Sequence, residues 1–505
     1  MQKTILKYTL LLFVGLIVSN LTSAQEMNNT LYLMKNVPQS NQLNPAIQPE
    51  CKVVFGFPGL SSIYLNYSNN GFSYNDIIKD GTGLQKDSLV VDINSFHDAL
   101  QSTNRISNQF NYTFFTLGIR AKKMFFTLDV SSKVDTRFGF DKGLISFFKD
   151  GNAAYMGQTA NLGAIGLEGT AYNEVALGVS KQVTEKLTVG IKAKALFGVA
   201  NMYMDNSNLS VYTSESGDLV RLRSKQLMKV SMPLDITEKT DPDGTSYIDD
   251  IDILDDDIDA NFFSGTDNKG FAFDLGATYQ FDEKITFYAS ILDIGSIKWK
   301  NSYELYQDAS FDWAGGDWSQ SGNSNDPNYR EIEDVMEDLT DSISDAFRFR
   351  DNTGSYSKAL PTKVYLGGSY DLNKRLSFGA VSRTEIYDGK IRPSLTLSAN
   401  TRVIRNFSAS FSYSMVNNSY NNIGVGVAGK LGPFQIYAVS DNILAMNPST
   451  ARLANVRFGV NMMFGCRKKK GRKKDVCKIQ EDLILEHMQK INNKKTEEEK
   501  QDKYK

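Results

Sequence analysis

The sequence has very few of the residues that catalytic and metal sites use most often. Among 505 residues there are two histidines, three cysteines and three tryptophans. His97 and His487 match no Ser-His-Asp or zinc-protease motif, and the cysteines match no zinc-site spacing. The composition therefore argues against an enzyme and against a metal or other cofactor. Nothing in it predicts a nucleic-acid partner.

Long hydrophobic runs are also scarce. Lys3 and Lys7 precede a short apolar run, Tyr8–Val18, and small residues up to Ala24 suit cleavage. The run is shorter than the roughly 20 residues that a membrane helix needs. We therefore interpret residues 1–24 as a signal peptide that is cleaved after Ala24, which predicts export. Nothing after it resembles a membrane helix, so any membrane crossing must use strands.

Glycine and aromatic residues are abundant, with 38 Gly, 30 Phe and 24 Tyr against 11 Pro. From about residue 53, alternating runs meet short turns of charged or turn-forming residues, and the next connection is longer and polar. The short turns fall at 121–123, 183–186, 282–284, 373–375, 404–406 and 432–433. The long segments fall at about 69–108, 140–169, 206–268 and 300–358. Short turns on one side and long loops on the other are typical of outer-membrane barrels.

This pattern predicts an all-β fold, a closed antiparallel transmembrane β-barrel of about 14 strands over residues 51–465. The first strand is expected near Val53–Tyr67 and the last at Leu453–Phe464. Residues 206–234 are either one more hairpin or a long extension. A soluble barrel would turn its apolar face inward. We expect lipid outside instead, because a 14-strand cylinder is too wide for its own side chains to fill.

Strand phase separates an apolar face from a charged one. In the strand that begins at Gly270, for example, Phe271, Phe273 and Leu275 lie opposite Asp274. The charged residues expected inside are Asp129, Lys133, Arg137, Glu174, Lys192, Lys194, Asp274, Lys363, Arg383 and Glu385. They form either a polar pathway or plug-holding network, or a set of mutually satisfied ion pairs. The second interpretation is favoured, since mixed signs at close quarters tend to pair.

Three stretches of the sequence resemble a known group of barrels. They are LYLMKNVPQSNQLNPAIQPE (31–50), the strands at 270–299 and the final SDNILAMNPSTARLANVRFGVNMMFG (440–465). The chain is similar there to exported Bacteroidota barrels related to the FadL-type long-chain fatty-acid channels. Relatives in that group are associated with type IX secretion and gliding. The shared element is Asn44-Pro45-Ala46, just before the first strand.

The resemblance implies a bacterial outer-membrane location and binding or passage of a small hydrophobic molecule. It also implies that residues 25–50 form a hatch inside the barrel, with ligand passing between hatch and wall. The alternative for this segment is a disordered leader. The alternative for the whole chain is a barrel that transports nothing and binds partners for secretion, gliding or envelope organisation.

The loop after residue 299 is the strongest candidate for a ligand-binding mouth. Asp326 and Pro327 suit a helix start, and apolar residues then recur at helical spacing. The candidate ligand-binding residues are Trp313, Trp318, Ile332, Val335, Met336, Leu339 and Ile343. This helix is either the wall of a hydrophobic groove or a lid packed on neighbouring loops. The acidic stretch Ser246–Asp259 lacks the order of a calcium loop and is expected to be solvated.

The chain ends carry two further expectations. If the first and last strands are neighbours, Cys51 and Cys466 share one rim and form a disulfide; the alternative pair is Cys466–Cys477. Residues 466–505 form a basic tail with a short amphipathic helix, which either docks a periplasmic protein or is solvated. The expected partners are thus membrane lipid, a hydrophobic small molecule and a periplasmic protein.

Overall fold

The computed structural model describes residues 27–81, 86, 88–163, 165–232, 234–240, 242, 244, 246–253, 267–314, 337, 342, 353–404, 406–416, 419–446 and 449–466. The expected signal peptide, the mouth helix apart from isolated positions, and the tail after Cys466 lie outside these residues. The chain divides into two units, Met1–Phe464 and Gly465–Lys505. The fold below is that of the first unit.

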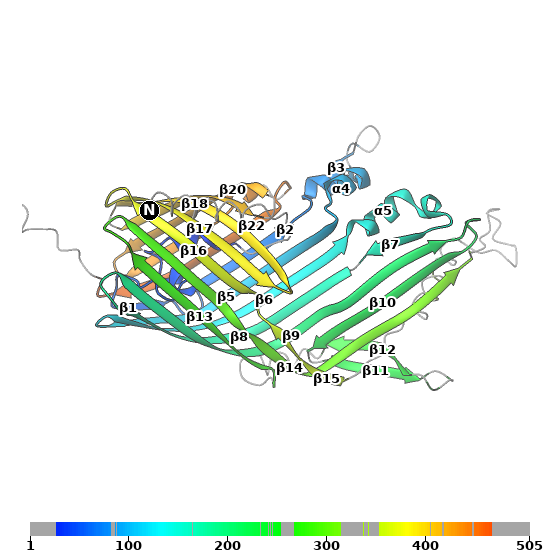
Figure 1. Ribbon diagram of the computed structural model, residues 1–505, viewed down its shortest axis with the longest axis horizontal. Coiled ribbons are helices and arrows are strands. Elements are labelled where there is room, and N and C mark those ends of the chain that lie inside the picture. Colours follow the sequence, from blue (N-terminus) through cyan, green and yellow to red (C-terminus); the bar gives the residue numbers. More distant parts are fainter. Residues whose placement is uncertain are drawn as a thin grey trace, which may run out of the picture. The chain divides into compact units, whose positions relative to one another are not determined.

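One large sheet of 18 strands makes up most of the first unit (Figure 1). Its strands are β1 (Val53–Gly56), β2 (Ser62–Asn69), β5 (Thr103–Ala121), β6 (Met124–Asp141), β7 (Thr159–Gly163), β8 (Ile165–Gln182), β9 (Leu187–Thr213), β10 (Val220–Ser231), β13 (Lys269–Gln280), β14 (Ile285–Trp313), β15 (Thr353–Ala359), β16 (Thr362–Asp371), β17 (Leu376–Tyr387), β18 (Lys390–Ile404), β19 (Phe407–Val416), β20 (Ser419–Leu431), β21 (Phe434–Ser440) and β22 (Leu453–Phe464).

The antiparallel pairings of these strands run in a ring. They pass in order through β5, β6, β8, β9, β13, β14, β16 and β17. They continue through β18 to β22, and β22 pairs with β1 and β2, which both pair with β5. The all-β, antiparallel class is confirmed. The number of about 14 crossing strands stays a prediction, because β7, β10 and β15 follow only parts of longer strands.

The expected short turns are where the sequence placed them. β5 ends at Ala121 and β6 begins at Met124, and Lys122 between them has a positive φ of 55°. The first strand, however, is split. Pro58 and Gly59 separate β1 from β2, because proline cannot donate to the ladder and Gly59 takes a φ of 78°.

The expected long loop over 206–268 is wrong for its first half. β9 and β14 are 27 and 29 residues long, and β10 pairs with both beyond the point where β13 begins (Figure 1). Of the two alternatives for 206–234, the hairpin is therefore observed. Ion pairs join β10 to β14, such as Arg221–Asp312 at 2.5 Å and Lys225–Asp308 at 2.9 Å. These charges gave the segment the polar appearance of a loop.

Within the described residues, the unit also contains two small hairpins and several short helices. The hairpins are β3 (Ile78–Asp80) with β4 (Leu89–Val91), and β11 (Leu234–Thr240) with β12 (Ser246–Ile253). The helices are α2 (Asn29–Tyr32), η1 (Pro38–Gln42), α3 (Tyr74–Ile77), α4 (Ile93–Ala99), α5 (Lys142–Asp150), η3 (Asn152–Tyr155) and η4 (Ile443–Met446). The expected acidic loop is thus wrong over Ser246–Ile253, which is strand β12, although Asp249 and Asp250 are exposed there as expected. The remainder of the stretch lies outside the described residues.

No helix within the described ranges has the length and apolar character needed to cross a bilayer. The same part of the chain holds no cluster of His, Cys, Asp and Glu fit for a metal ion.

The two faces of the ring differ in the way that strand phase predicted. On β13, Phe271 is 69% exposed on the outer face, whereas Asp274 on the inner face is 1% exposed. Large apolar side chains are likewise exposed on β14, β17, β19 and β22, including Phe287, Phe378, Phe411 and Phe458. A protein in water buries such residues. Here the polar face is the buried one.

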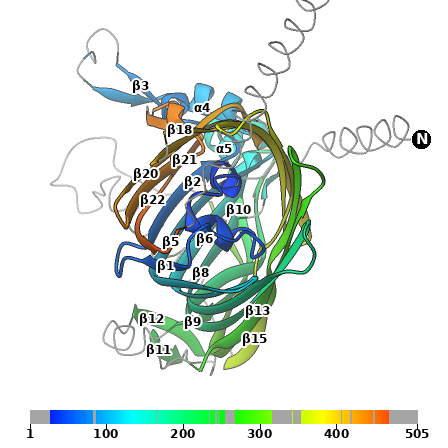
Figure 2. The ribbon, with the colours of Figure 1, turned by 90° about the vertical axis from the view of Figure 1, so that its left-hand side faces the viewer.

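Residues 27–50, called the N-terminal segment below, lie within the ring. Figure 2 shows their dark-blue coils surrounded by strands. Met27, Leu31, Tyr32 and Val37 are at most 1% exposed. They pack against inward side chains of the wall, so the segment takes the place that a hydrophobic core has in a solid barrel.

The cysteines are described in part. Cys51 and Cys466 are each disulfide-bonded, and Cys477 lies outside the described residues. Next to Cys51, the Lys52 backbone N–H donates to the Phe464 carbonyl at 3.0 Å. The start of β1 and the end of β22 are therefore neighbours, as the predicted Cys51–Cys466 pair requires. The pairing itself stays a prediction.

Candidate functional site

The motif Asn44-Pro45-Ala46 rests on the inner wall formed by β9, β13 and β14. The Asn44 amide nitrogen lies 3.3 Å from the Ala277 carbonyl and 3.2 Å from the Ala289 carbonyl. The Asn44 side-chain oxygen accepts from the Ala46 N–H at 2.9 Å, which makes a tight turn. The asparagine thus holds its own loop and two wall strands together.

Two wall glycines make this close contact possible. A Cβ on Gly190 would lie 2.4 Å from the Pro45 carbonyl carbon, and one on Gly276 would lie 2.3 Å from the Asn44 side-chain oxygen. Real Cβ atoms do not approach other atoms so closely, so only glycine fits at these positions. The inner wall is shaped to the N-terminal segment at these points.

Aromatic packing also holds the N-terminal segment. The Tyr32 ring stacks on Tyr365 with centroids 4.8 Å apart and meets Tyr288 edge-on at 6.3 Å. Such pairs contribute about 0.5–1.5 kcal/mol each beyond area burial. The Tyr32 hydroxyl contacts Ser290 and Asn44, and burial raises its pKa above the ordinary value. It therefore stays a neutral phenol at any physiological pH.

Three wall arginines bind polar groups of the N-terminal segment. Arg457 of β22 donates to the Asn28 and Gln42 side chains, at 3.1 Å in both cases. Arg402 of β18 donates to Asn36, and Arg120 of β5 donates to the Pro49 carbonyl. These contacts come from widely separated strands, so they hold the segment on several sides of the ring.

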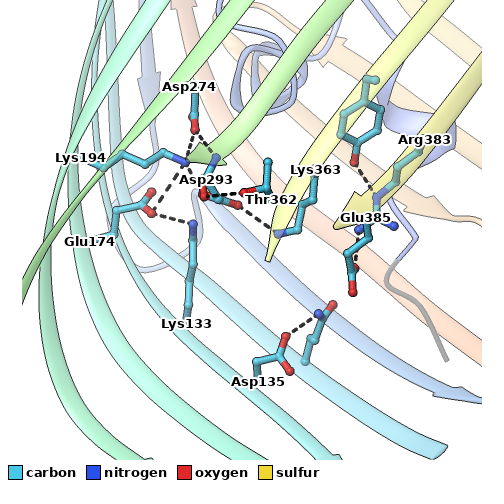
Figure 3. A network of polar contacts seen from close by, with 12 residues as sticks. Lys133, Asp135, Glu174, Lys194, Asp274, Asp293, Thr362, Lys363, Arg383 and Glu385 are labelled. Carbon is cyan, nitrogen blue, oxygen red and sulfur yellow. Dashed lines mark hydrogen bonds and ion pairs between the residues drawn. The ribbon is translucent and has the colours of Figure 1, made fainter. Parts of the chain in front are cut away.

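The charged residues expected inside the barrel lie on its inner face, and five of the ten form one network around Lys194 (Figure 3). Lys194 lies at its centre, 2.7 Å from Asp274, 2.5 Å from Asp293 and 3.9 Å from Glu174. The other pairs are Lys133–Glu174 at 2.7 Å, Lys363–Asp293 at 3.1 Å, Lys192–Asp129 at 2.8 Å, Arg383–Glu385 at 3.1 Å and Arg137–Glu385 at 3.7 Å. Mutual pairing is thus the arrangement observed for all ten predicted residues.

Asp293 is the network residue that strand phase missed. The pairing of β13 with β14 shifts register between Phe273 and Leu275, and Asp293 has a φ of 58°. A bulge adds one residue to a strand, so Leu292 and Asp293 are both buried while Ile294 is exposed. Aspartate tolerates this left-handed conformation better than most residues. A period of two along the sequence cannot show such a shift.

Other charged partners were also absent from the predicted set. Asp135 binds Arg137 at 3.1 Å, Arg392 binds Glu385 at 3.2 Å, and Glu168 lies 3.6 Å from Lys358. Asp135 lies on the same face as Arg137 two residues on, so strand phase did contain that signal. The pairing partners of Arg392 and Lys358 depend on the fold.

The predicted mouth residues are mostly outside the described part of the chain. Trp318, Ile332, Val335, Met336, Leu339 and Ile343 all fall there. Trp313 is the last residue of β14 and is half-buried. The predicted ligand-binding role of the mouth helix stays a prediction.

His97, which matches no Ser-His-Asp motif in the sequence, contacts a serine in the fold. Its Nε2 lies 3.1 Å from the Ser146 hydroxyl, and Asp98 lies 3.4 Å from its Nδ1. Ser146, however, donates its hydroxyl proton to the Lys142 carbonyl. The His97–Ser146 contact joins α4 to α5.

The cavities among the described residues include a large one and two smaller polar ones. The large cavity has a volume of about 660 Å³ and is bounded by β2, β5, β6, β22 and the segment that leads from β21 into η4. Its apolar lining includes Leu65, Phe110, Val134, Ile443, Ala454 and Val456, and no charged side chain among the described residues takes part. We call it the apolar groove.

The two small cavities lie in the polar interior. One, of about 70 Å³, adjoins Asn28 and Gln42 of the N-terminal segment and the Lys194 network. The other, of about 50 Å³, is lined by Gln109, Trp299 and Tyr387. Lys133, Asp293 and Lys363 form part of the wall of both. The ion-pair network therefore separates these two spaces.

Together these features define an antiparallel β-barrel with an apolar exterior, a charged interior and an N-terminal segment within the ring. The sequence matches the Family of unknown function (DUF5723) over residues 45–441. The chain belongs to this family. No curated protein matches the sequence.

Several solved structures are similar to the chain at low sequence identity. The toluene transporter TbuX of Ralstonia pickettii has a TM-score of 0.38 and 10% identity, covering 85% of this chain and 94% of its own. A FadL homologue of Pseudomonas aeruginosa has a TM-score of 0.39 and 12% identity, covering 88% and 100%. The translocator domain of the autotransporter NalP from Neisseria meningitidis has a TM-score of 0.29 and 8% identity, covering 86% and 100%. The fold assignment rests on the strand pairings of this chain.

Proposed function

We propose that this chain is a bacterial outer-membrane barrel that binds or passes a small hydrophobic molecule. The outer face supports the membrane location, because exposed Phe, Leu and Ile side chains cover strands whose inner face is polar. A strand can cross a bilayer only when its backbone groups are paired, and the ring of antiparallel pairings supplies partners on both sides of each strand.

The observation that carries the proposed ligand class is the apolar groove. At about 660 Å³ it is within the range of typical small-molecule sites, about 300–1,000 Å³. The absence of charged side chains from its described lining selects an uncharged, apolar ligand. Toluene, the substrate named for TbuX, is of this class, but the support for the proposal is the groove itself.

The charged interior of the ring is unfavourable for a hydrophobic ligand. A hydrophobic molecule gains nothing from entering a space lined by Lys194, Asp274 and Asp293, because their ion pairs would lose hydrogen bonds without replacement. The N-terminal segment fills much of the remaining space. We therefore assign hydrophobic binding to the groove and give the N-terminal segment the role of a hatch that closes the lumen.

Filling the groove is expected to abolish binding of a hydrophobic ligand. Ala454 lines the groove on the outer face of β22, so Ala454→Trp places an indole in the cavity. Native mass spectrometry of the detergent-solubilised protein with added 1-dodecanol measures the adduct. The variant should retain at least tenfold less dodecanol than the wild type.

The matched control is Ala380→Trp. Ala380 is also a half-buried alanine on a ring strand, β17, and it does not line the groove. It should keep the wild-type adduct. Equal dodecanol binding by all three proteins would show that the groove is not the binding site.

A partner-binding barrel remains the second hypothesis from the sequence. Its main support, the tail from Arg467 onward, lies outside the described residues. No feature of the described chain favours it over the groove.

A further inference from the structure

The smaller polar cavity of about 50 Å³ contains hydrogen-bonding groups that the rest of the described chain leaves unused. The Trp299 side chain is 0% exposed, and its indole N–H has no hydrogen-bond partner within the described chain. The Gln109 side-chain oxygen, on a residue 6% exposed, also has none. Both residues line the cavity. A buried tryptophan N–H normally finds a partner, and leaving it without one is costly.

The charged groups around this cavity are already neutralised. Lys133 pairs with Glu174 at 2.7 Å, Lys363 with Asp293 at 3.1 Å, and Arg137 with Asp135 at 3.1 Å. Figure 3 shows Lys133 and Lys363 turned toward their carboxylate partners. A charged ligand would have to break one of these pairs. The cavity therefore favours an uncharged ligand.

The unused groups define the hydrogen bonds of that ligand. Trp299 needs an acceptor and Gln109 needs a donor, and a hydroxyl group supplies both. The rings of Trp299 and Tyr172 add apolar surface, and both belong to one buried cluster. One water needs about 10–15 Å³ of such space, so the cavity has room for about three to five water-sized groups, the size of a small polyol.

We propose that this cavity binds a small uncharged polyol of about the size of glycerol. Its hydroxyl groups accept from the Trp299 N–H and donate to the Gln109 oxygen, while its C–H faces contact the aromatic rings. The site is inside the ring, and of its described lining only Gln109 also lines the apolar groove. The proposal does not depend on hydrophobic binding.

The test uses the indole N–H signals of the full-length protein. With ¹⁵N-tryptophan, the three tryptophans give three signals, which Trp313→Phe and Trp318→Phe assign by elimination. Glycerol and ethylene glycol are then titrated into protein purified without either compound. The Trp299 signal should shift saturably with at least one of them, while the other two signals stay in place.

A second variant measures the contribution of the hydrogen bond. Trp299→Phe keeps an aromatic ring and removes the N–H, so the titration calorimetry affinity for the same probe should fall about tenfold. Trp313→Phe does not touch the cavity lining and should bind as the wild type does. A Trp299 signal that neither probe moves, or equal drifts of all three signals, would overturn the proposal. Dodecanol binding is measured separately and is expected to survive either result.

Discussion

Gly190→Val is expected to release the N-terminal segment and make a silent barrel conduct ions. A Cβ at this position would lie 2.4 Å from the Pro45 carbonyl carbon and 2.7 Å from the Ala46 nitrogen. Both are backbone atoms, which cannot turn aside as a flexible side chain can. Overpacking of this kind costs about 1–3 kcal/mol or more, and here relaxation requires the Asn44-Pro45-Ala46 loop to leave the wall.

The measurement is single-channel current in planar lipid bilayers, with limited proteolysis of the N-terminal segment beside it. The wild type should show no current steps, and its N-terminal segment should be protected from protease. Gly190→Val should show current steps and cleavage before residue 50. Gly429→Val on β20 is the control, because the nearest atom to its Cβ would be 4.0 Å away. A folded Gly190→Val barrel that stays silent and protected would mean that the segment does not close the lumen.

Removing the cation at the centre of the ion-pair network should give the largest loss of stability. Lys194 is 5% exposed and neutralises Asp274 and Asp293 at 2.7 and 2.5 Å. Lys194→Met keeps the length of the side chain and leaves buried carboxylates short of positive charge. Breaking a buried pair in this way costs about 3–5 kcal/mol.

Urea unfolding in lipid vesicles, followed by tryptophan fluorescence and gel mobility, measures this change. Lys225→Met is the matched control: its pair with Asp308 is similar in distance, 2.9 Å, but both side chains are about 70% exposed. Water screens that pair, so little change is expected. If the two variants lose the same stability, the interior network contributes nothing beyond a surface ion pair.

Local sequence patterns were sufficient for the strands and the short turns. Alternation placed Phe271 outside and Asp274 inside, and turns such as Lys122–Lys123 follow from charged residues between alternating runs. Both signals act over a few neighbouring residues, so they do not depend on how distant parts of the chain pair.

Features that depend on pairing between distant strands could not be predicted from local sequence patterns. The bulge at Asp293 changes the phase of β14, and β10 looks like a loop until its charges meet those of β14. The apolar groove joins residues as distant as Leu65 and Val456, and the two wall glycines at Gly190 and Gly276 are explained only by Pro45 and Asn44. These features exist only once the ring has formed.

The central claim, hydrophobic binding in the apolar groove, is tested most directly by photo-crosslinking. The full-length protein in nanodiscs is irradiated with a diazirine-labelled C16 alcohol, and the labelled peptides are identified by mass spectrometry. The account predicts that unlabelled alcohol competes away labels on peptides containing Leu65, Ile443 and Val456. Competable labels on the N-terminal segment or the Lys194 network instead, or no competable label on the groove, would contradict it.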